Sequence, residues 1–290
     1  MFAISLKQSD PYQTYILTDK AAQARVEIVP ERGGLIASWR IQGQDLLYMD
    51  AERFADPDLS VRGGVPILFP ICGNLPNNTY TYDGNQYQLK QHGFARDLPW
   101  EVRDRQTQDG AALTLALTSN EKTRAVYPFD FELVFTYRLK GNSLILDQHF
   151  RNCSNKVMPF TTGLHPYFWS TDKAQLEFDI PATQYRERDA EAAHPFNGQF
   201  DFGRDEIDVA LMPLQRNWAS MTNWRQRYKI VIAYSSFYPI LVFWTIQGKD
   251  YCCLEPWSGP RNALNTGEQL SVLGPGASCE AQVEMSVSYL

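Results

Sequence analysis

The chain has 290 residues, of which 44% are hydrophobic and 21% charged, and its 27 Lys and Arg against 33 Asp and Glu give a net charge of −6. This acidic balance argues against a protein that holds nucleic acid by its phosphates, because such proteins need clustered Lys and Arg. The longest apolar stretch, from Tyr238 to Ile246, is about half of the ~20 residues that a membrane helix needs. We therefore expect a cytoplasmic protein, monomeric or homodimeric, with no nucleic-acid or membrane partner.

Apolar residues recur with a period of two along much of the chain, which is typical of half-buried β-strands. The clearest such runs are Val26 and Ile28, Leu113 to Leu117, Phe131 to Leu139, Leu176 to Ile180, and Ala281 to Tyr289. The many short strands that this pattern predicts favour a β-sandwich.

Turn residues separate the predicted strands. Asp83-Gly84 stands between two short polar-aromatic runs and predicts a hairpin, and Gly141-Asn142 predicts another. Helical periodicity is scarce, and the segment from Asp45 to Phe54 is the best candidate for a short helix. No linker or low-complexity tract divides the chain. We expect one all-β domain over residues 1–290, a large antiparallel sandwich with few short helices.

Most motifs of cofactor and metal chemistry are missing from the sequence. There is no G-x-G-x-x-G after a strand, no G-x-S-x-G, no H-E-x-x-H and no C-x-x-C among the five cysteines. We therefore expect neither a cofactor nor a metal. Acid–base chemistry by His and carboxylate groups remains.

Polar residues gather among glycines and prolines in segments that interrupt the strand pattern. These segments are Arg62 to Pro70, Gln91 to Arg96, Thr162 to Phe168, and Leu254 to Asn262. Loops of this kind on a rigid sheet are where a site is normally built.

Two ionisable residues in these segments could do acid–base work. His165 precedes Pro166, which restricts its backbone, and its imidazole could protonate a substrate near neutral pH; a structural, hydrogen-bonded histidine is an equal alternative. Glu255 follows an apolar run and lies next but one to Trp257, so partial burial could raise its pKa, as suits a base. An ordinary solvated glutamate at a strand end is the alternative for Glu255.

Three further residues could bind a ligand. His92 precedes Gly93, a residue that lets the backbone pass close to a ligand. Arg62 and Arg96 flank the glycine-rich segments and could clamp an anion or sugar hydroxyls. The alternatives are a turn histidine and two solvated surface arginines.

Four stretches together resemble a known family. They are RGGVPILFPICG (Arg62 to Gly73), HGFAR (His92 to Arg96), GLHPYF (Gly163 to Phe168) and EPWSGPRNALNTG (Glu255 to Gly267). In this order, over nearly the whole chain, they resemble the aldose 1-epimerase (mutarotase) family, most of all the branch that includes the hexose-6-phosphate mutarotases. The resemblance implies the galactose-mutarotase-like fold, a large twisted antiparallel β-sandwich, with a sugar as partner.

The resemblance also implies roles for individual residues. His165 would be the general acid and Glu255 the general base, acting from separate loops on one sugar. Arg62 and His92 would hold sugar hydroxyls, and Arg96 would join Arg62 if the sugar carries a phosphate.

The family usually has one more binding aspartate between the catalytic histidine and glutamate. Asp208 has a suitable place in the sequence, and Asp201 and Asp205 are the alternatives. The arginine- and asparagine-rich stretch of galactose-specific members is replaced by RGGVP at Arg62, which argues against strict galactose preference.

We expect an isomerase that interconverts the α and β anomers of a sugar by ring opening and reclosure. The net charge of −6 favours a free aldohexose over a dianionic substrate. A hexose 6-phosphate is the first alternative. A non-catalytic carbohydrate-binding or sugar-sensing protein on the same scaffold is the second.

Overall fold

The computed structural model describes residues 1–8, 11–188, 190 and 192–290. Strands dominate it, and the α-helices of the described residues are short: α1 (Ala51–Ala55), α2 (Glu121–Val126) and α3 (Ala263–Thr266). Single 3₁₀ turns occur at η1 (Pro30–Arg32), η2 (Pro76–Asn78), η3 (Ala95–Asp97) and η4 (Lys173–Gln175). None of the helices in this part of the chain is long and apolar enough to span a membrane.

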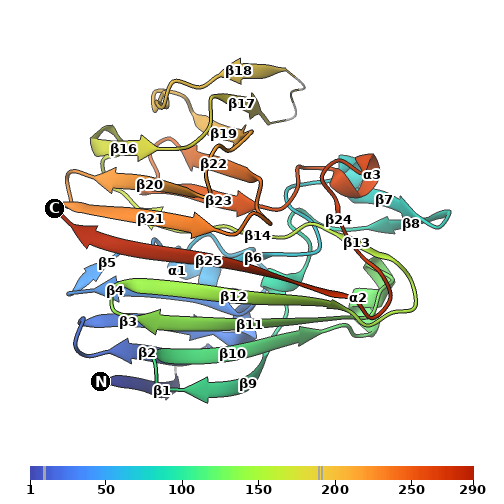
Figure 1. Ribbon diagram of the computed structural model, residues 1–290, viewed down its shortest axis with the longest axis horizontal. Coiled ribbons are helices and arrows are strands. Elements are labelled where there is room, and N and C mark those ends of the chain that lie inside the picture. The colour runs from blue at the N-terminus through green and yellow to red at the C-terminus, as the bar shows by residue number, and fades with distance from the viewer. Residues whose placement is uncertain (9–10, 189, 191) are drawn as a thin grey trace.

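One layer of the fold is a continuous eight-stranded antiparallel sheet, here called the long sheet, which faces the viewer in Figure 1. Its strands, in spatial order, are β16 (Leu176–Asp179), β20 (Trp218–Asn223), β21 (Tyr228–Tyr234), β25 (Ser278–Tyr289), β12 (Ser143–Asn152), β11 (Phe131–Lys140), β10 (Ala111–Thr118) and β9 (Glu101–Gln106).

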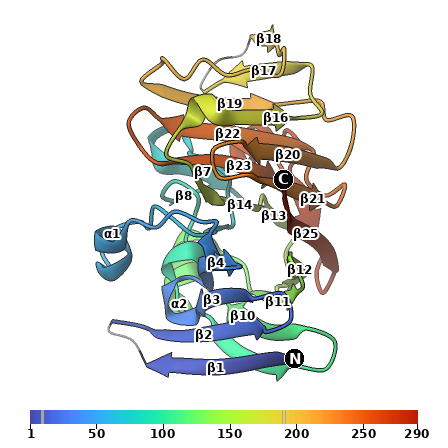
Figure 2. The ribbon, with the colours of Figure 1, turned by 90° about the vertical axis from the view of Figure 1, so that its left-hand side faces the viewer.

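Two further sheets share the other side of the long sheet (Figures 1 and 2). The N-terminal sheet has the order β1 (Phe2–Gln8), β2 (Gln13–Asp19), β3 (Ala24–Val29), β4 (Leu35–Ile41) and β5 (Gln44–Asp45), and it packs on β10 and β11. The cleft sheet has the order β18 (Ala193–Pro195), β17 (Gln184–Glu187), β19 (Glu206–Leu211), β22 (Ile240–Ile246), β23 (Tyr251–Trp257), β14 (Gly163–Leu164) and β6 (Ile67–Leu68), with β15 (Tyr167–Trp169) also on β23. The all-β sandwich expected from the sequence is confirmed.

Two small ribbons complete the described strands: β7 (Thr79–Tyr82) with β8 (Asn85–Gln88), and β13 (Met158–Phe160) with β24 (Ser271–Leu273). The predicted hairpin at Asp83-Gly84 joins β7 to β8, and both turn residues have positive φ, 50° and 75°. This is the conformation that a two-residue hairpin turn requires.

The period-two pattern marks the strands correctly because alternate residues face the core. In β11 every second residue from Phe131 to Leu139 is apolar and buried, while the residues between them, Val134 included, are half-buried. The run that begins at Leu176 ends one residue early, at Asp179, where Pro181 follows closely. A residue before proline is restricted, and proline has no N–H to donate.

The helix expected from Asp45 to Phe54 is mostly wrong. Only its last part is helical, because α1 begins at Ala51, and the Asp50 side chain caps it by accepting from the Arg53 N–H. The residues before it are extended: Leu47 bridges to Phe168 and Met49 to Gly63. Pairing with distant strands thus overrides the local helical pattern.

Candidate active site

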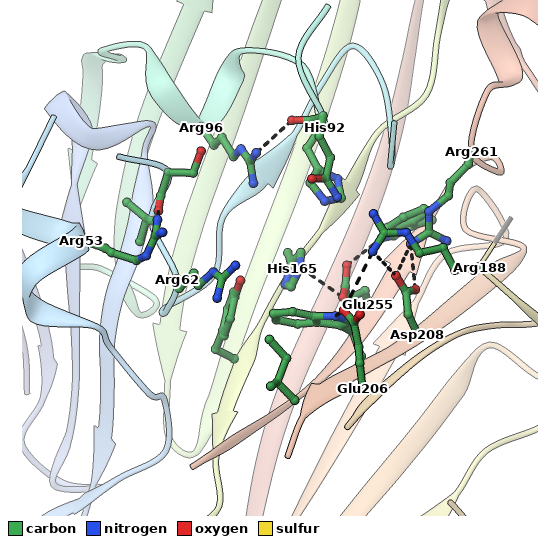
Figure 3. Close-up of a pocket in the computed structure, with 17 residues that line it drawn as sticks. Arg53, Arg62, His92, Arg96, His165, Arg188, Glu206, Asp208, Glu255 and Arg261 are labelled. Atoms are coloured by element: carbon green, nitrogen blue, oxygen red, sulfur yellow. Dashed lines mark hydrogen bonds and ion pairs between the residues drawn. The ribbon is translucent and has the colours of Figure 1, made fainter. Parts of the chain in front are cut away.

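The residues singled out in the sequence come together at one cleft over the outer face of the cleft sheet (Figure 3). The cleft has a volume of about 410 Å³, and Arg62, His92, Arg96, His165, Asp208 and Glu255 all line it. Asp208 is buried, whereas Asp201 and Asp205 are exposed and do not line this cleft. Of the three aspartates considered, only Asp208 is therefore placed to meet a ligand there.

Strand register brings His165 opposite Glu255. In the antiparallel pairing with β23, Gly163 lies opposite Trp257 and Tyr167 opposite Cys253, so the residues midway between them, 165 and 255, share one register position. Side chains at such a position point to the same face of a sheet. Glu255 thus lies within a strand and His165 between two short ones, rather than on the separate loops expected.

His165 is held in a closed environment. Its Nε2 lies 3.3 Å from Glu255 Oε1, its ring stacks on Tyr167 at 4.6 Å between centroids, and only 6% of the residue is exposed. Its Nδ1 is buried without a hydrogen-bond partner among the described residues. Burial, and next the positive charge of Arg96, lower the pKa of His165 to about 3, because both disfavour an imidazolium.

Glu255 is buried still more deeply, with 1% of the residue exposed. The Trp257 indole N–H donates to its Oε2 at 3.0 Å. Burial, followed by the nearby charge of Asp208, raises the pKa of Glu255 well above its ordinary value, against the opposing effect of that hydrogen bond. Burial therefore favours the neutral form of each group, the protonated carboxyl of Glu255 and the unprotonated imidazole of His165.

Asp208 anchors the far side of the cleft through two arginines. Arg261 donates from Nη2 to both carboxylate oxygens, at 2.7 and 2.9 Å, and Arg188 Nη1 lies 3.5 Å from Oδ2. Trp244, opposite Asp208 in the β19–β22 pairing, donates from its indole to Glu206 at 2.6 Å. This side of the cleft therefore offers polar groups whose charges are already balanced.

His92 presents a fixed hydrogen-bond donor to the cleft. The Gly73 N–H donates to His92 Nδ1 at 3.1 Å, and the His92 N–H donates to the Gly73 carbonyl at 2.7 Å. Burial lowers the pKa of His92 well below its ordinary value, with Arg96 adding to the effect. The neutral ring accepts at Nδ1, so its proton is on Nε2.

Gly93 serves packing rather than ligand approach, contrary to the expectation from the sequence. Its φ is +70°, and a Cβ there would lie 2.3 Å from the Phe69 carbonyl oxygen. The close backbone neighbour of Gly93 is thus the chain itself. The His92 backbone also has a positive φ, 66°, and this turn points the imidazole towards the cleft (Figure 3).

The opposite side of the cleft from Asp208 is positively charged. Arg53, Arg62 and Arg96 lie there together (Figure 3), and the ion pairs that the described residues form in this cleft involve none of them. The Arg53 guanidinium donates to the Ser60 carbonyl and the Arg96 guanidinium to the Gln91 carbonyl, while the Arg62 guanidinium lies 6.0 Å from the Trp244 ring centroid. We call these three residues the arginine cluster.

The buried residue Arg32 holds the loop that carries Arg53. It is 3% exposed, and its Nη2 donates to the backbone carbonyls of Arg53, Asp56 and Leu59. Charge-assisted bonds of this kind are stronger than neutral ones. They fix the loop that closes the positive side of the cleft.

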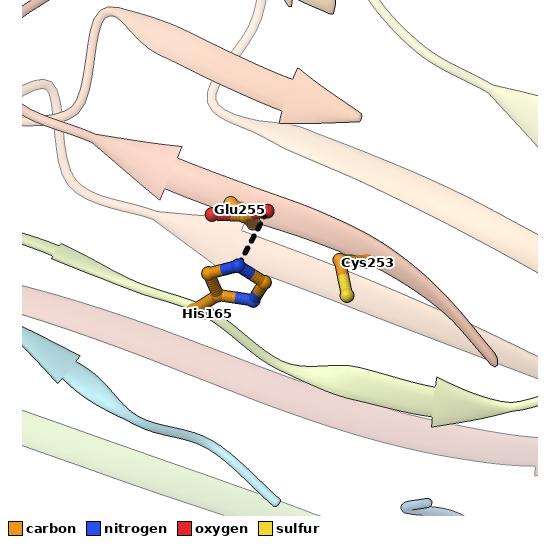
Figure 4. Close-up of side chains that lie close together, drawn as sticks. All are labelled: His165, Cys253 and Glu255. Carbon is orange, nitrogen blue, oxygen red and sulfur yellow. Dashed lines mark ion pairs between the residues drawn. The ribbon is translucent and has the colours of Figure 1, made fainter. Parts of the chain in front are cut away.

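His165, Cys253 and Glu255 are close enough for one ligand atom of each to reach a common ion, within 4.8 Å of one another (Figure 4). All three are buried, and burial raises the pKa of the Cys253 thiol well above its ordinary value. A metal binds the thiolate rather than the thiol. A cation bound between these groups would also replace the direct contact of His165 with Glu255. We therefore assign no metal to this group.

A family model described as "Aldose 1-epimerase" matches residues 14–286. The chain belongs to the aldose 1-epimerase family. This confirms the resemblance seen in the four motifs, and members of this family are isomerases that act on carbohydrates.

Individual relatives in the family are similar to different extents. "Putative glucose-6-phosphate 1-epimerase" of Escherichia coli (strain K12) is 31% identical over 147 residues, which are 50% of this chain and 45% of that protein. The matched part therefore spans less than half the length of that relative. Among solved structures, the Slr1438 protein from Synechocystis sp. PCC 6803 is 48% identical over 100% of both chains, with a TM-score of 0.95. A galactose mutarotase related enzyme from Lactobacillus acidophilus is 26% identical over 95% of this chain and 97% of that one, with a TM-score of 0.78.

The sequence alone does not identify several of the residues that line the cleft. Arg53 and Arg188 lie in charged stretches that look like ordinary surface, and Trp244 lies in an apolar strand that looks like core. Arg261 had a usable signal, because it stands in the motif that begins at Glu255. Only the fold brings the other three to the cleft.

Proposed function

We propose that the chain interconverts the α and β anomers of a hexose, with Glu255 as general base and His165 as general acid. The observation that carries the proposal is the contact of His165 Nε2 with Glu255 Oε1 at 3.3 Å, at the floor of an open cleft. A base and an acid this close can serve two oxygens on one carbon, the anomeric hydroxyl and the ring oxygen.

The reaction moves two protons and returns both. The Glu255 carboxylate takes the proton of the anomeric hydroxyl while the His165 imidazolium gives one to the ring oxygen, and the bond from C1 to that oxygen breaks. The open-chain aldehyde then turns about C1–C2. Closure from the other face reverses both transfers and yields the opposite anomer. No electron leaves the sugar, so the chemistry needs only acid–base groups.

The remaining cleft residues have roles in holding the sugar. Asp208, tied by Arg261 and Arg188, can accept from hydroxyl groups, and the His92 Nε2–H can donate to one. Both side chains are buried and fixed by hydrogen bonds before the sugar enters, so little ordering is needed on binding.

We propose a hexose 6-phosphate as the substrate. Five arginines line the cleft against three carboxylates, Glu206, Asp208 and Glu255, and the arginine cluster has the unbalanced charge. Guanidinium groups bind phosphate by charge-assisted, bidentate hydrogen bonds. The net charge of −6 favours a free aldohexose instead, but a local cluster acts on a bound ligand more strongly than a distant net charge. The free aldohexose is the second candidate.

The experiment measures anomer exchange of glucose 6-phosphate and of glucose by exchange NMR of the anomeric protons, with the uncatalysed rate subtracted. We expect kcat/KM to be higher for the phosphate, and the ratio to collapse in Arg96→Ala. A ratio below one that does not respond to Arg96 would instead select the free sugar. Binding of both sugars without any catalysed exchange would favour a sugar-binding or sugar-sensing protein.

A further inference from the structure

The cleft contains a conflict between its charge and its chemistry. The proposed reaction needs an imidazolium at His165, yet His165 is 6% exposed, and three arginines on one side of the cleft have no carboxylate partner in its described ion pairs. Positive charges in a poorly solvated site oppose a further positive charge. Something must compensate the arginine cluster before His165 can act as an acid.

We propose that the anionic group of the substrate switches on the general acid: a dianion held by the arginine cluster moves the shared proton from Glu255 to His165. This rests on the proposed function and adds a regulatory role for the phosphate, beyond binding. The free enzyme is then in a resting form, with the carboxyl of Glu255 protonated and His165 neutral.

The structure provides the path for this proton. It crosses one contact, from Glu255 Oε1 to His165 Nε2, over 3.3 Å. The transfer breaks one O–H bond and makes one N–H bond, and it leaves the charge of the pair unchanged. Its product is a carboxylate beside an imidazolium, which is the pair of groups that ring opening requires.

The charged groups around His165 decide the direction of the transfer. Arg96, Arg261 and Arg62 all act to lower the pKa of His165, and Arg96 and Arg261 also lower the pKa of Glu255. Because Arg62 and Arg96 lie on the His165 side of the pair (Figure 3), a dianion bound there favours a positive charge on His165 more than it favours a proton on Glu255. Arg261 is already balanced by Asp208, so the two members of the arginine cluster, Arg62 and Arg96, are the ones a dianion would compensate. Arg62 and His165 also lie near the same indole ring. The Arg62 guanidinium carbon is 6.0 Å and the His165 ring centroid 5.6 Å from the ring centroid of Trp244.

Neighbouring rings do not compete for the proton. His92, 5.6 Å from His165 between ring centroids, accepts from the Gly73 N–H at Nδ1 and stays neutral. Tyr167, stacked on His165, has its pKa raised well above the ordinary value by burial and stays protonated. A change in the cleft potential therefore acts on the His165–Glu255 pair.

The first test separates the sugar from its anion. D-Xylose lacks the sixth carbon of glucose, so it leaves room for phosphite dianion. We expect phosphite to raise the protein-dependent kcat/KM for xylose exchange by about tenfold or more, towards the ~10²–10⁴ that general acid catalysis contributes, whereas chloride at equal ionic strength does not. Arg62→Met should lose this activation, and Arg25→Gln, at a residue that does not line the cleft, should keep it. Activation that persists in Glu255→Gln would overturn the proposal.

The second test observes His165 directly, whether or not phosphite binds. The chain has 4 histidines, so ¹⁵N signals of the ring can be assigned with His165→Asn. We expect 1,5-anhydroglucitol 6-phosphate, which cannot open, to shift His165 towards the imidazolium at pH 7, and unphosphorylated 1,5-anhydroglucitol to leave it neutral.

The outcomes distinguish this inference from the proposed function. If glucose 6-phosphate is the better substrate but His165 is equally neutral with both analogues, the switch is wrong and the substrate proposal stands. If glucose is turned over as well as its phosphate, the substrate proposal fails. A His165 already protonated in the free protein overturns the switch whatever the substrate.

Discussion

His165, between β14 and β15, occupies the register position opposite Glu255 of β23, although the two residues are far apart in the sequence. Their contact is therefore set by main-chain pairing rather than by flexible loops. The Pro66 carbonyl accepts from the His165 N–H at 3.0 Å, which fixes the histidine backbone from its other side. A site built on paired strands can hold an acid and a base at a defined separation.

Replacing the base should abolish turnover without unfolding the protein. We expect Glu255→Gln to lower kcat by about 10²–10⁴, the usual contribution of a general base, because glutamine has nearly the same shape and no carboxylate. Anomer exchange NMR measures the rate, and circular dichroism checks the fold. Near-normal activity in a folded variant would remove Glu255 from the mechanism.

Replacing the acid should separate catalysis from binding. His165→Asn should lose kcat with KM little changed, because donation to the ring oxygen strengthens in the transition state. Saturation kinetics with the better sugar distinguish the two parameters. If KM rose steeply while kcat persisted, His165 would hold the substrate rather than protonate it.

The buried carboxyl should cost stability at neutral pH. Because the folded pKa of Glu255 is raised, its stabilising contribution is present below the unfolded pKa of about 4.3 and is lost as pH rises through the folded pKa. Glutamine is neutral at every pH, so the Glu255→Gln variant should have a higher melting temperature than wild type at pH 8. At pH 4 the two proteins should have similar melting temperatures. Each pKa unit is worth about 1.4 kcal/mol, and each kcal/mol about 2–4 °C in Tm. A variant less stable at pH 8 would contradict the raised pKa.

The two nitrogens of His92 can be tested separately. Asparagine can place an acceptor near Nδ1 and keep the Gly73 hydrogen bond, but it cannot reach into the cleft. His92→Asn should therefore keep its melting temperature while KM rises. His92→Gln can place a donor near Nε2, so it should retain more substrate binding and lose stability, because the buried Gly73 N–H loses its partner. The opposite pattern would mean that the assigned tautomer is wrong.

Activity should not depend on a metal. Exhaustive chelation should leave the exchange rate unchanged, because the buried Cys253 thiol beside His165 and Glu255 holds its proton. The exchange rate of Cys253→Ala, measured in parallel, should likewise be the same with and without a chelator. A rate lost on chelation and restored by one metal would show that these three residues are ligands.

The sequence predicts strands well because burial on one face leaves a period-two trace, as in Phe131 to Leu139. It predicts His165, Glu255 and His92 as candidates because glycine and proline mark their segments. It does not predict Arg53 or Arg188, because nothing local distinguishes an arginine that faces a cleft from one that faces solvent. The pairing of Leu47 with Phe168 likewise cannot be predicted from the sequence, because only the folded chain brings those two segments together.

The two ends of the cleft come from different parts of the chain. The proposed acid and base stand on β23 and the segment paired with it, whereas Arg53 stands in α1, within a separate loop that Arg32 ties down through four carbonyls. In Figure 2 this loop, with α1, projects away from the sheets. Exchange of residues 50–60 for a segment of other chemistry could therefore redirect the enzyme to a different sugar, provided that Arg32 keeps its carbonyl partners. The part of the cleft that we propose for sugar selectivity thus includes a segment apart from the proposed acid and base, which makes this loop the place to begin redesign.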